Sequence, residues 1–219
     1  YEIGFKGNLN KNFLFQTSIF YQDREDVQTK QSIVTSINSG EQGGLCPCSF
    51  TDYIGNAVKG SNYGLETELI WLINNKIDLF FNLGLLETKF NNYLSFSHVD
   101  SDLENGTPVN LNGREQSHAP RYQLSLGINY KITDDLFIKF DIEAKDEFYF
   151  SDRHNVQSDD YVLFNLLLGY QKESWEFNIF GKNLSDEDYQ TRGFGSFGND
   201  PRKFYATEPY FQFGSPRVI

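Results

Sequence analysis

Apolar and polar residues alternate along much of the chain, which is the pattern of β-strands with two unlike faces. Within residues 122–130 every second residue is apolar, and Tyr122 and Tyr130 stand at the two ends of that apolar face. At roughly 3.3 Å per residue the two rings lie about 26 Å apart, which a tilt of about 45° reduces to near 20 Å across a bilayer. This spacing predicts a strand that crosses a membrane between two belts of aromatic side chains.

The same aromatic spacing recurs in two other segments of the chain. Three of the six aromatic residues stand beside short turns and are expected in the periplasmic belt, namely Phe13, Trp71 and Tyr130. The other three are expected in the outer belt, namely Tyr21, Tyr63 and Tyr122. The repetition favours a set of membrane-crossing strands over a single chance pattern.

Nine strands are predicted from the alternation, the last of them cut off at Ile219. They cover residues 1–9, 13–23, 62–72, 77–90, 120–131, 136–146 and 160–171, a strand from Trp175, and a last strand from Pro209 or Tyr210. Short turns alternate with long loops, which are expected at 24–61, 91–119, 147–159 and 185–208. Outer-membrane barrels have short periplasmic turns and long extracellular loops. A soluble β-sandwich also alternates apolar and polar residues but has no reason to sort its loops by length.

The composition agrees with an all-β protein. The 219 residues include 21 Phe and 13 Tyr but only 6 Pro, so strand-forming residues are abundant. No apolar run reaches about 18 residues, which excludes a transmembrane helix. The negative mean hydropathy does not oppose a membrane barrel, since only alternate strand residues meet lipid. The formal net charge of −11 argues against nucleic acid as a partner and against a polybasic membrane anchor.

The chain begins within a strand pattern and contains no Met. We therefore expect it to be a piece of a larger precursor. Bacterial single-chain barrels normally have an even number of strands, and an open sheet edge in lipid costs several kcal/mol for each unpaired group. Further strands are expected upstream of Tyr1.

Four motifs resemble those of TonB-dependent outer-membrane receptors. The stretch WEFNIFGKNLSDEDYQT carries an aromatic-rich strand followed by Asn183, Leu184, Asp186 and Tyr189, as in the penultimate strand of these receptors. The other three are GLETEL at 64–69, HAPRYQLSLGINY at 118–130 and FGSPR at 213–217. Each motif is loose by itself, but their order and spacing across essentially all of the chain are specific.

The resemblance implies an antiparallel transmembrane β-barrel of 22 strands, closed by a plug domain. Residues 1–219 would form one barrel segment of about the nine C-terminal strands, with the plug and the earlier strands upstream and the end of the last strand missing. The implied location is the outer membrane of a Gram-negative bacterium. The implied partners are outer-membrane lipid and lipopolysaccharide, the TonB energy-transducing complex acting through the absent plug, and a nutrient ligand.

The resemblance further implies uptake of a bulky, scarce nutrient, such as a ferric siderophore or another metal chelate. A TonB-dependent importer of carbohydrate or cobalamin and a passive porin are the alternatives. No cofactor is implied. An enzyme is not expected, because no nucleophile and base stand in a recognisable arrangement. A soluble β-sandwich binding module would be a different class of protein.

Two groups of residues are candidates for contacts inside the barrel and at its mouth. Charged side chains expected to face the lumen are Glu66, Glu68, Lys139, Asp141, Glu143 and Lys145. They could form a polar path or contact a plug, or simply pair across neighbouring strands. Loop residues that could stack on or clamp a ligand are Arg192, Phe194, Phe197, Arg202 and Tyr205. The alternative for this second group is packing of the loops over the barrel mouth.

Cysteine and histidine occur only in or beside the expected loops. Cys46 and Cys48 favour a small local disulfide over a metal site, since two thiolates without a nearby His are too few for a metal. His98, His118 and His154 could contact a metal complex, although loop histidines are most often simply polar. No metal site is therefore predicted.

Overall fold

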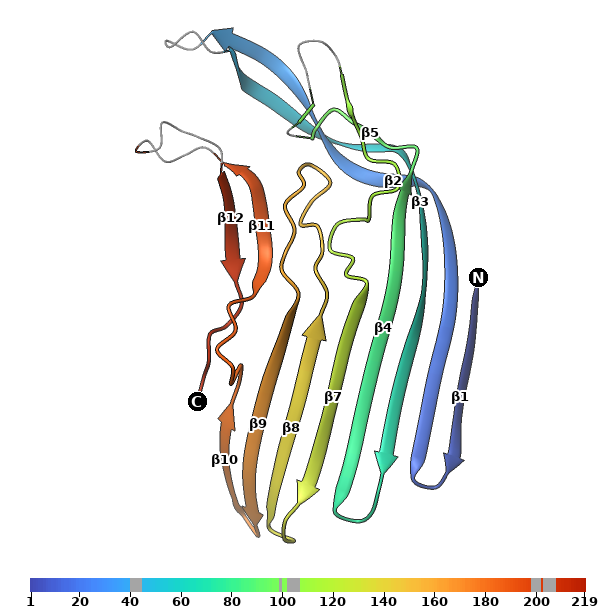
Figure 1. The fold of residues 1–219 in the computed structure, drawn as a ribbon, viewed down its shortest axis with the longest axis vertical. Coiled ribbons are helices and arrows are strands. Elements are labelled where there is room, and N and C mark those ends of the chain that lie inside the picture. Colours follow the sequence, from blue (N-terminus) through green and yellow to red (C-terminus); the bar gives the residue numbers. More distant parts are fainter. Residues whose placement is uncertain (40–44, 99, 102–106, 198–201, 203–207) are drawn as a thin grey trace.

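The computed structural model describes residues 1–39, 45–98, 100–101, 107–197, 202 and 208–219. For residues 29–39, 45–50, 52, 56–58 and 196–197 it describes the backbone alone. Eight strands of the described chain form one antiparallel sheet in the order β1, β2, β3, β4, β7, β8, β9, β10 (Figure 1). Their bounds are β1 Glu2–Asn10, β2 Phe13–Ser39, β3 Leu45–Leu72, β4 Ile77–Asn91, β7 Tyr122–Lys131, β8 Leu136–Lys145, β9 Tyr161–Lys172 and β10 Trp175–Gly181. No helix of these residues is long and apolar enough to span a bilayer.

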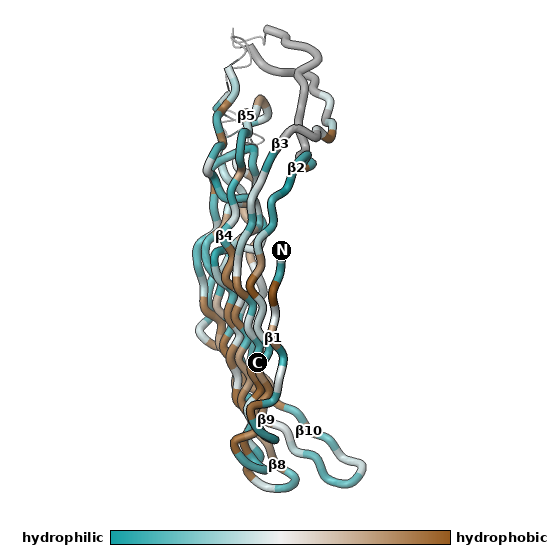
Figure 2. The backbone as a smooth tube through the Cα atoms, turned by 90° about the vertical axis from the view of Figure 1, so that its right-hand side faces the viewer, coloured by the Kyte–Doolittle hydropathy of each residue, from teal (hydrophilic) through white to brown (hydrophobic). Residues whose placement is uncertain are grey.

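The register keeps apolar side chains on one face of the sheet from strand to strand. Phe81 of β4 lies opposite Leu126 of β7, which lies opposite Ile142 of β8. Along the strands, hydrophobic positions gather in a band below a more hydrophilic outer part (Figure 2). Large apolar side chains on this face are exposed, and Ile179 retains 68% of its accessible surface. A face of this kind is stable only against another apolar medium, as the outside of a membrane barrel requires.

The predicted aromatic belts are in register between β2 and β3. Phe13 pairs with Trp71, and their rings lie 6.2 Å apart edge to face. Eight residues further along β2, Tyr21 pairs with Tyr63. The shared register explains why the aromatic spacing repeats, because both strands cross the same apolar band.

The connection expected as a long loop at 24–61 is mostly strand, so that prediction was wrong. β2 continues to Ser39, and β3 already begins at Leu45. Register shifts beside Val27 interrupt the pairing, and Asp26 has a positive φ of 52°. A β-bulge bends a strand and strengthens its twist, and here the hairpin turns away from the sheet beyond this point (Figure 1). Outside the bilayer both faces of a ribbon meet water, so no apolar alternation marks it.

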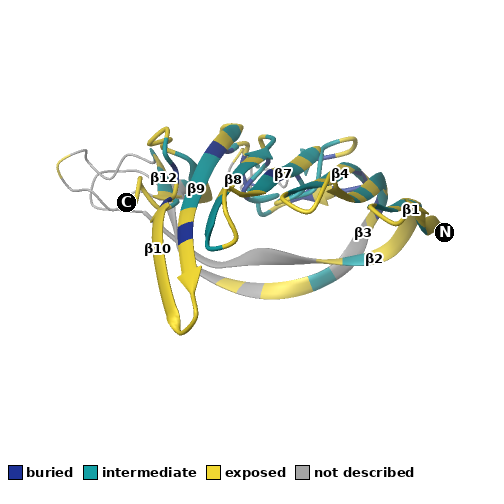
Figure 3. Cartoon of the chain, turned by 90° about the horizontal axis from the view of Figure 1, so that it is seen from below, coloured by how far each residue is buried: buried dark blue, intermediate teal, exposed yellow. Residues whose placement is uncertain are grey.

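The segment expected as a loop at 185–208 also contains a strand. β11 (Gln190–Phe197) pairs with β12 (Glu208–Phe213) in a separate hairpin. Two short strands, β5 (Leu94–Ser95) and β6 (Val109–Asn110), form a further pair within the 91–119 connection. Seen from below, the strands of the sheet show mainly exposed and intermediate positions (Figure 3). Buried residues gather instead at the outer end, in the last residues of β4 and in the connections; they include Phe90, Tyr93, Leu111, Phe148 and Phe150.

Candidate functional site

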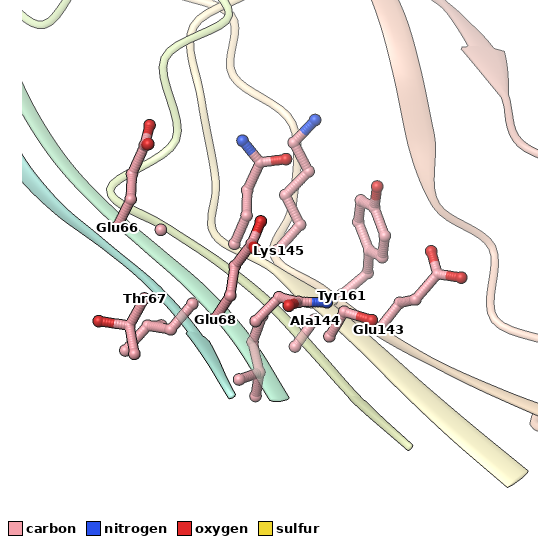
Figure 4. A pocket seen from close by; sticks show the side chains of 13 residues that line it. Glu66, Thr67, Glu68, Glu143, Ala144, Lys145 and Tyr161 are labelled. Atoms are coloured by element: carbon pink, nitrogen blue, oxygen red, sulfur yellow. The ribbon is translucent and has the colours of Figure 1, made fainter. Parts of the chain in front are cut away.

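The polar face of the sheet carries a shallow hollow lined by charged side chains. The register places Glu66 in one row with Lys145, and Glu68 in the next row with Glu143. The hollow that these residues help to line has a volume of about 520 Å³. Figure 4 shows their side chains on one side of the sheet, with Thr67 pointing to the other side. The wall thus offers hydrogen-bonding groups of both charges, with the acidic groups in excess.

Amide side chains donate hydrogen bonds to carboxylates lower on the same face. The Asn165 Nδ2 group donates to Asp141 Oδ2 at 2.7 Å and to Glu143 Oε1 at 3.3 Å. One row of the register further from the outer end, the Asn129 Nδ2 group of β7 donates to Asp78 Oδ2 of β4 at 2.6 Å. Cross-strand hydrogen bonds of this kind hold the acids in place without an ion pair.

Three aromatic rings on the polar face lie over glycines of the neighbouring strand. The ring of Phe80 covers Gly127, and the ring of Phe137 covers Gly169. Phe20 covers Gly64 in the same way. A Cβ atom on any of these glycines would overlap the ring. The rings can therefore lie flat against the sheet and leave the space inside it to polar groups.

The outer connections are joined by hydrogen bonds around a small buried cluster. The rings of Phe90 and Tyr93 lie 4.9 Å apart, and Leu111 packs against them. The Tyr93 hydroxyl donates to Asp152 Oδ2 at 2.7 Å, which ties the 91–119 connection to the 147–159 connection. Val27 of β2 packs against the same cluster, so the base of the long hairpin is fixed by it.

Arg114 makes the second link between these two connections. Its Nη2 group donates to the carbonyl oxygens of Ser151, at 2.7 Å, and of His154. Its guanidinium carbon lies 4.0 Å from the centre of the Tyr149 ring, a cation–π distance. A planar guanidinium can stack and donate at once, which an ammonium cannot do equally well.

All three histidines of the chain lie in or at the edges of these connections. His98 Nε2 lies 3.2 Å from Asn155 Oδ1, and His154 is only 6% exposed. Burial lowers the pKa of His154, and the nearby Arg114 guanidinium lowers it further. Burial also lowers the pKa of His118, and Lys145 and Arg192 add to the effect. Both imidazoles are therefore held in the neutral form at neutral pH.

Cationic side chains and aromatic rings meet where the sheet ends at the outer loops. The Lys145 Nζ atom lies 4.7 Å from the centre of the Phe148 ring, and Arg192 lies 5.6 Å from the centre of the Phe194 ring. Strand β12 packs against the 147–159 connection, since the ring centroids of Phe211 and Phe150 lie 5.9 Å apart. This group places positive charge beside aromatic rings, of which Phe194 is exposed and Phe148 is buried.

The segment between β10 and β11 is a hydrogen-bonded turn centred on Asn183, whose side chain is buried. The side-chain Nδ2 group of Asn183 donates to the carbonyl oxygens of Glu187, at 2.9 Å, and of Ser215, at 3.1 Å. Its Oδ1 atom accepts the Glu187 N–H at 2.9 Å, and its own N–H donates to Asn165 Oδ1 at 3.0 Å. Asn183 thus connects β9, the turn and the C-terminal segment, and it is 3% exposed.

Comparison with known proteins assigns the fold to a family. Residues 1–184 match the model of the family described as TonB dependent receptor-like, beta-barrel. The chain belongs to this family. TonB-dependent receptors are outer-membrane proteins of Gram-negative bacteria, and the family consists of transporters and not of enzymes. The predictions of family, fold class, location and absence of enzymatic activity are therefore confirmed.

Solved structures of similar fold include three transport proteins. The ferric yersiniabactin uptake receptor FyuA from Yersinia pestis is 20% identical with a TM-score of 0.69, and the match covers 99% of this chain and 28% of that one. The siderophore receptor PiuA from Acinetobacter baumannii is 17% identical with a TM-score of 0.69, covering 99% and 26%. The copper transporter OprC is 13% identical with a TM-score of 0.61, covering 99% and 29%. The chain spans between a quarter and a third of the length of these proteins.

Within this TonB-dependent receptor barrel, the six predicted lumen-facing charges share one face of the sheet. Asp141 and Lys139 continue on β8 the face that carries Glu143 and Lys145, and Glu66 and Glu68 join it through the strand register. Their common face agrees with the alternation in the sequence. Their contact with a plug or a ligand stays a prediction.

The predicted ligand-contacting residues are only partly within the described chain. Arg192 and Phe194 lie on β11, next to the 147–159 connection, and Arg202 is exposed. The backbone of Phe197 ends β11, while its side chain and all of Tyr205 lie outside the described residues. The backbones of Cys46 and Cys48 lie in β3, but their side chains are also outside, so their disulfide stays a prediction.

Sequence reasoning did not identify Arg114, Tyr93, Asp152 or Asn165 as site residues. Their roles depend on contacts between connections far apart in the chain, such as the Tyr93–Asp152 bond across 59 positions. In the sequence Asn183 stands only as part of a family motif. The signal for it is a polar residue between an aromatic strand and an acidic segment, which predicts a turn but not hydrogen bonds to distant parts of the chain.

Proposed function

We propose that the protein takes up a ferric siderophore or another anionic metal chelate through the outer membrane, with energy supplied by TonB. The polar face of the sheet lines the lumen, and the group of Lys145, Arg192, Phe148 and Phe194 lies at its outer mouth. The exposed pair of Arg192 and Phe194 is the observation that supports the proposal. Anionic chelates with flat ligand arms bind to positive charge and to ring faces together.

The acidic side chains that line the hollow below this group would bind an anionic chelate only weakly, which suits its passage. Glu66, Glu68 and Glu143 face the hollow with Lys145 as the cation on its lining. An anionic chelate would bind at the mouth and meet repulsion further down. Tight binding at the bottom of the wall would oppose release, which the acidic side chains avoid, and the energy from TonB would overcome the repulsion.

The solved structures of similar fold support transport of a chelate without fixing the ligand. Their printed names describe proteins for ferric yersiniabactin, a siderophore and copper. We also propose the TonB complex as a partner, acting through a plug domain, and lipopolysaccharide and lipid as the surroundings of the apolar face. A carbohydrate or cobalamin importer and a passive porin are the competing functions.

Uptake measurements on the full-length protein in a receptor-deficient strain test the proposal. We expect uptake of at least one ⁵⁵Fe-loaded siderophore, and loss of that uptake when tonB is deleted. Uptake of solutes that persists without TonB would instead identify a porin. Uptake of labelled maltodextrin or cobalamin without any iron chelate would identify one of the other importers.

Charge variants then test the site at the mouth. Lys145→Gln and Arg192→Gln should each weaken binding of the transported chelate about 10- to 150-fold, the loss of one charged hydrogen bond. Lys172→Gln is the control, because Lys172 pairs with Asp135 at 3.7 Å beside a short turn at the far end of the sheet. Equal affinities for all three variants and the wild type would contradict the proposed site.

A further inference from the structure

We propose that the described parts of the outer connections 91–119 and 147–159, together with the strands β11 and β12, form one unit that is held closed by neutral histidines and loosens on acidification. The inference concerns the loops themselves and does not depend on the identity of the ligand. It starts from the position of His154 and His118, each of which lies where separate parts of this unit meet.

His154 is enclosed by the two connections and by β11. Its ring occupies the space in front of Gly195, where a Cβ atom would overlap it. Its Nδ1 atom accepts the N–H of Val156 at 3.3 Å, and its carbonyl oxygen accepts a hydrogen bond from Arg114. An Nδ1 atom that accepts a hydrogen bond carries no proton. The observed arrangement therefore requires a ring that is unprotonated at this nitrogen.

The charged groups that face His154 oppose a second proton on its ring. Arg114 and His98 approach from the 91–119 connection, and Arg153 and Asp152 belong to its own connection. Asp152 is the one acid in this set, and it already accepts the Tyr93 hydroxyl. β11 contributes Gly195 at the contact and hence no charge. Protonation would place a cation among cations in a buried position, which repels the surrounding elements.

His118 lies in a similar setting between the sheet and the hairpin. Lys145 of β8 and Arg192 of β11 face it, while the 147–159 connection contributes the rings of Phe148 and Phe150 and a backbone hydrogen bond at Phe150. The ring centroids of His118 and Phe148 are 5.3 Å apart. The two cations oppose protonation, and the rings and the backbone acceptor only partly offset them.

The third histidine adds to the same unit. His98 has a fully buried side chain, with its Nδ1 atom 3.6 Å from Asp100 Oδ2 and its Nε2 atom near Asn155. The Asn155 Nδ2 group donates to Asp100 Oδ2 at 3.3 Å. His98 thus joins the two connections through an acid and an amide and also faces His154. A positive charge on His98 would raise the cost of a charge on the His154 ring.

The sign of the pH effect follows from the direction of the pKa shifts. The pKa values of His118 and His154 are lowered in the closed unit, so an opened unit binds more protons. The closed state is then favoured fully above about pH 6.5, the ordinary histidine value, and loses stability as the pH falls below it. Each histidine can shift the opening equilibrium by up to about thirty-fold at pH 5, the limit set by that ordinary value.

Hydrogen exchange of the full-length protein in lipid nanodiscs measures this opening. Protection factors, corrected for the intrinsic pH dependence of exchange, should fall for amides of 147–159 between pH 7.5 and pH 5.0. Amides of β7 and β8 within the apolar band serve as the internal reference and should keep their protection. Unchanged protection of 147–159 over this range would overturn the proposal.

The variant His154→Asn separates titration from simple loss of contacts. An asparagine can accept the N–H two residues ahead, as His154 does from Val156, but it does not titrate in this range. We expect near-normal protection at pH 7.5 and a clearly smaller fall at pH 5.0. A fall equal to that of the wild type would remove His154 from the mechanism.

Direct titration of the rings provides a readout that does not depend on the folding of a variant. In protein labelled with ¹³C at histidine, the ring resonances of His118 and His154 should titrate below pH 6.5. Lys145→Gln should move the midpoint of His118 to higher pH and leave His154 nearly unchanged, because Lys145 faces only the former. Titration midpoints at or above pH 6.5 for both rings would contradict the proposal that neutral histidines hold the unit closed.

Discussion

The side-chain amide of Asn183 donates to the carbonyl oxygen of Ser215 at 3.1 Å across 32 positions of the chain. Around this bond, Lys182 and Val218 exchange backbone hydrogen bonds of 2.8 and 3.0 Å, and the Arg217 N–H donates to Asp186 Oδ1 at 3.0 Å. The turn after β10 therefore holds the C-terminal segment in place where β10 leaves the sheet. The family motif is loose as a sequence pattern, but in the structure it forms these hydrogen bonds to the C-terminal segment, which we call the latch.

Removing the amide should weaken this latch selectively. Asn183 has a positive φ of 49°, so Asn183→Gly keeps the backbone conformation while deleting the side chain. The change leaves the Glu187 N–H and two carbonyl oxygens without partners, and we expect a loss of about 2–4 kcal/mol in unfolding free energy. Urea unfolding of the receptor in lipid vesicles measures it.

The matched control for this change is another asparagine of the same region. Asn178 is exposed on β10 and donates to Glu176 at 2.7 Å along its own strand. Asn178→Ala should change stability by no more than about 0.5 kcal/mol. If Asn183→Gly proved equally mild, the turn would be a passive connection and not a latch.

The sequence predicts the strands of the membrane band well and the parts outside it poorly. β8 was expected at 136–146 and is found at Leu136–Lys145, because lipid on one side and polar groups on the other impose strict alternation. The outer half of β2 lacks that asymmetry and was mistaken for a loop. The backbone pairing of β2 and β3 continues there, and it leaves no hydrophobic signature in the sequence.

The candidate site likewise contains a part that the sequence predicts, on the strands, and a part that it does not, in the connections. The alternation of side chains along β3 and β8 is enough to predict one common face for four charged residues, Glu66, Glu68, Glu143 and Lys145. The packing of His154 against Gly195 could not be foreseen, because it depends on how two connections fold over each other. Such contacts join residues whose separation in sequence carries no regular period.

Glycine and aromatic residues that meet across strands should be coupled in stability. Gly127→Ala would place a methyl group on the Phe80 ring, so we expect a loss of about 1–3 kcal/mol. Gly84→Ala is the matched control on the same face, because a Cβ atom there meets nothing within 4 Å. It should be neutral or stabilising by up to about 1 kcal/mol.

A double variant tests the cause of the Gly127 effect. Phe80→Leu removes the flat ring from above Gly127, so Gly127→Ala should cost clearly less in that background. The coupling appears as a difference between the two costs in thermal unfolding of the receptor in detergent. Strict additivity would mean that backbone strain, rather than the ring, opposes the methyl group.

The Tyr93–Asp152 hydrogen bond should control the outer loops without affecting the barrel. Tyr93→Phe keeps the buried ring beside Phe90 but removes the 2.7 Å bond, which costs about 1.5–3 kcal/mol for a charged acceptor. We expect cleavage by trypsin after Arg153 in whole cells to become about 10-fold faster or more. Heat-modifiable migration of the barrel should stay normal.

The comparison for this loop variant is Tyr63→Phe. Tyr63 is 46% exposed on the apolar face, in the outer aromatic belt, and its partners in the sheet are Tyr21 of β2 and Glu87 of β4. Its loss of a hydroxyl should leave cleavage after Arg153 unchanged. Equal acceleration by both changes would point to a general loosening of the barrel instead of a broken link between loops.

The two faces of β7 should respond oppositely to the same charge. Leu126 lies in the apolar band, in one row with Phe81 and Ile142, so Leu126→Arg should cost about 2–4 kcal/mol in folding into lipid vesicles. Ser125 is its neighbour on the polar face, in one row with Asn82 and Glu143, and Ser125→Arg can pair with that carboxylate. Its expected cost is within about 1 kcal/mol, measured by urea titration of the same receptor in the same vesicles. Similar costs at the two positions would mean that both faces of β7 are buried in protein, and the assignment of lipid and lumen to the faces of this sheet would have to be abandoned.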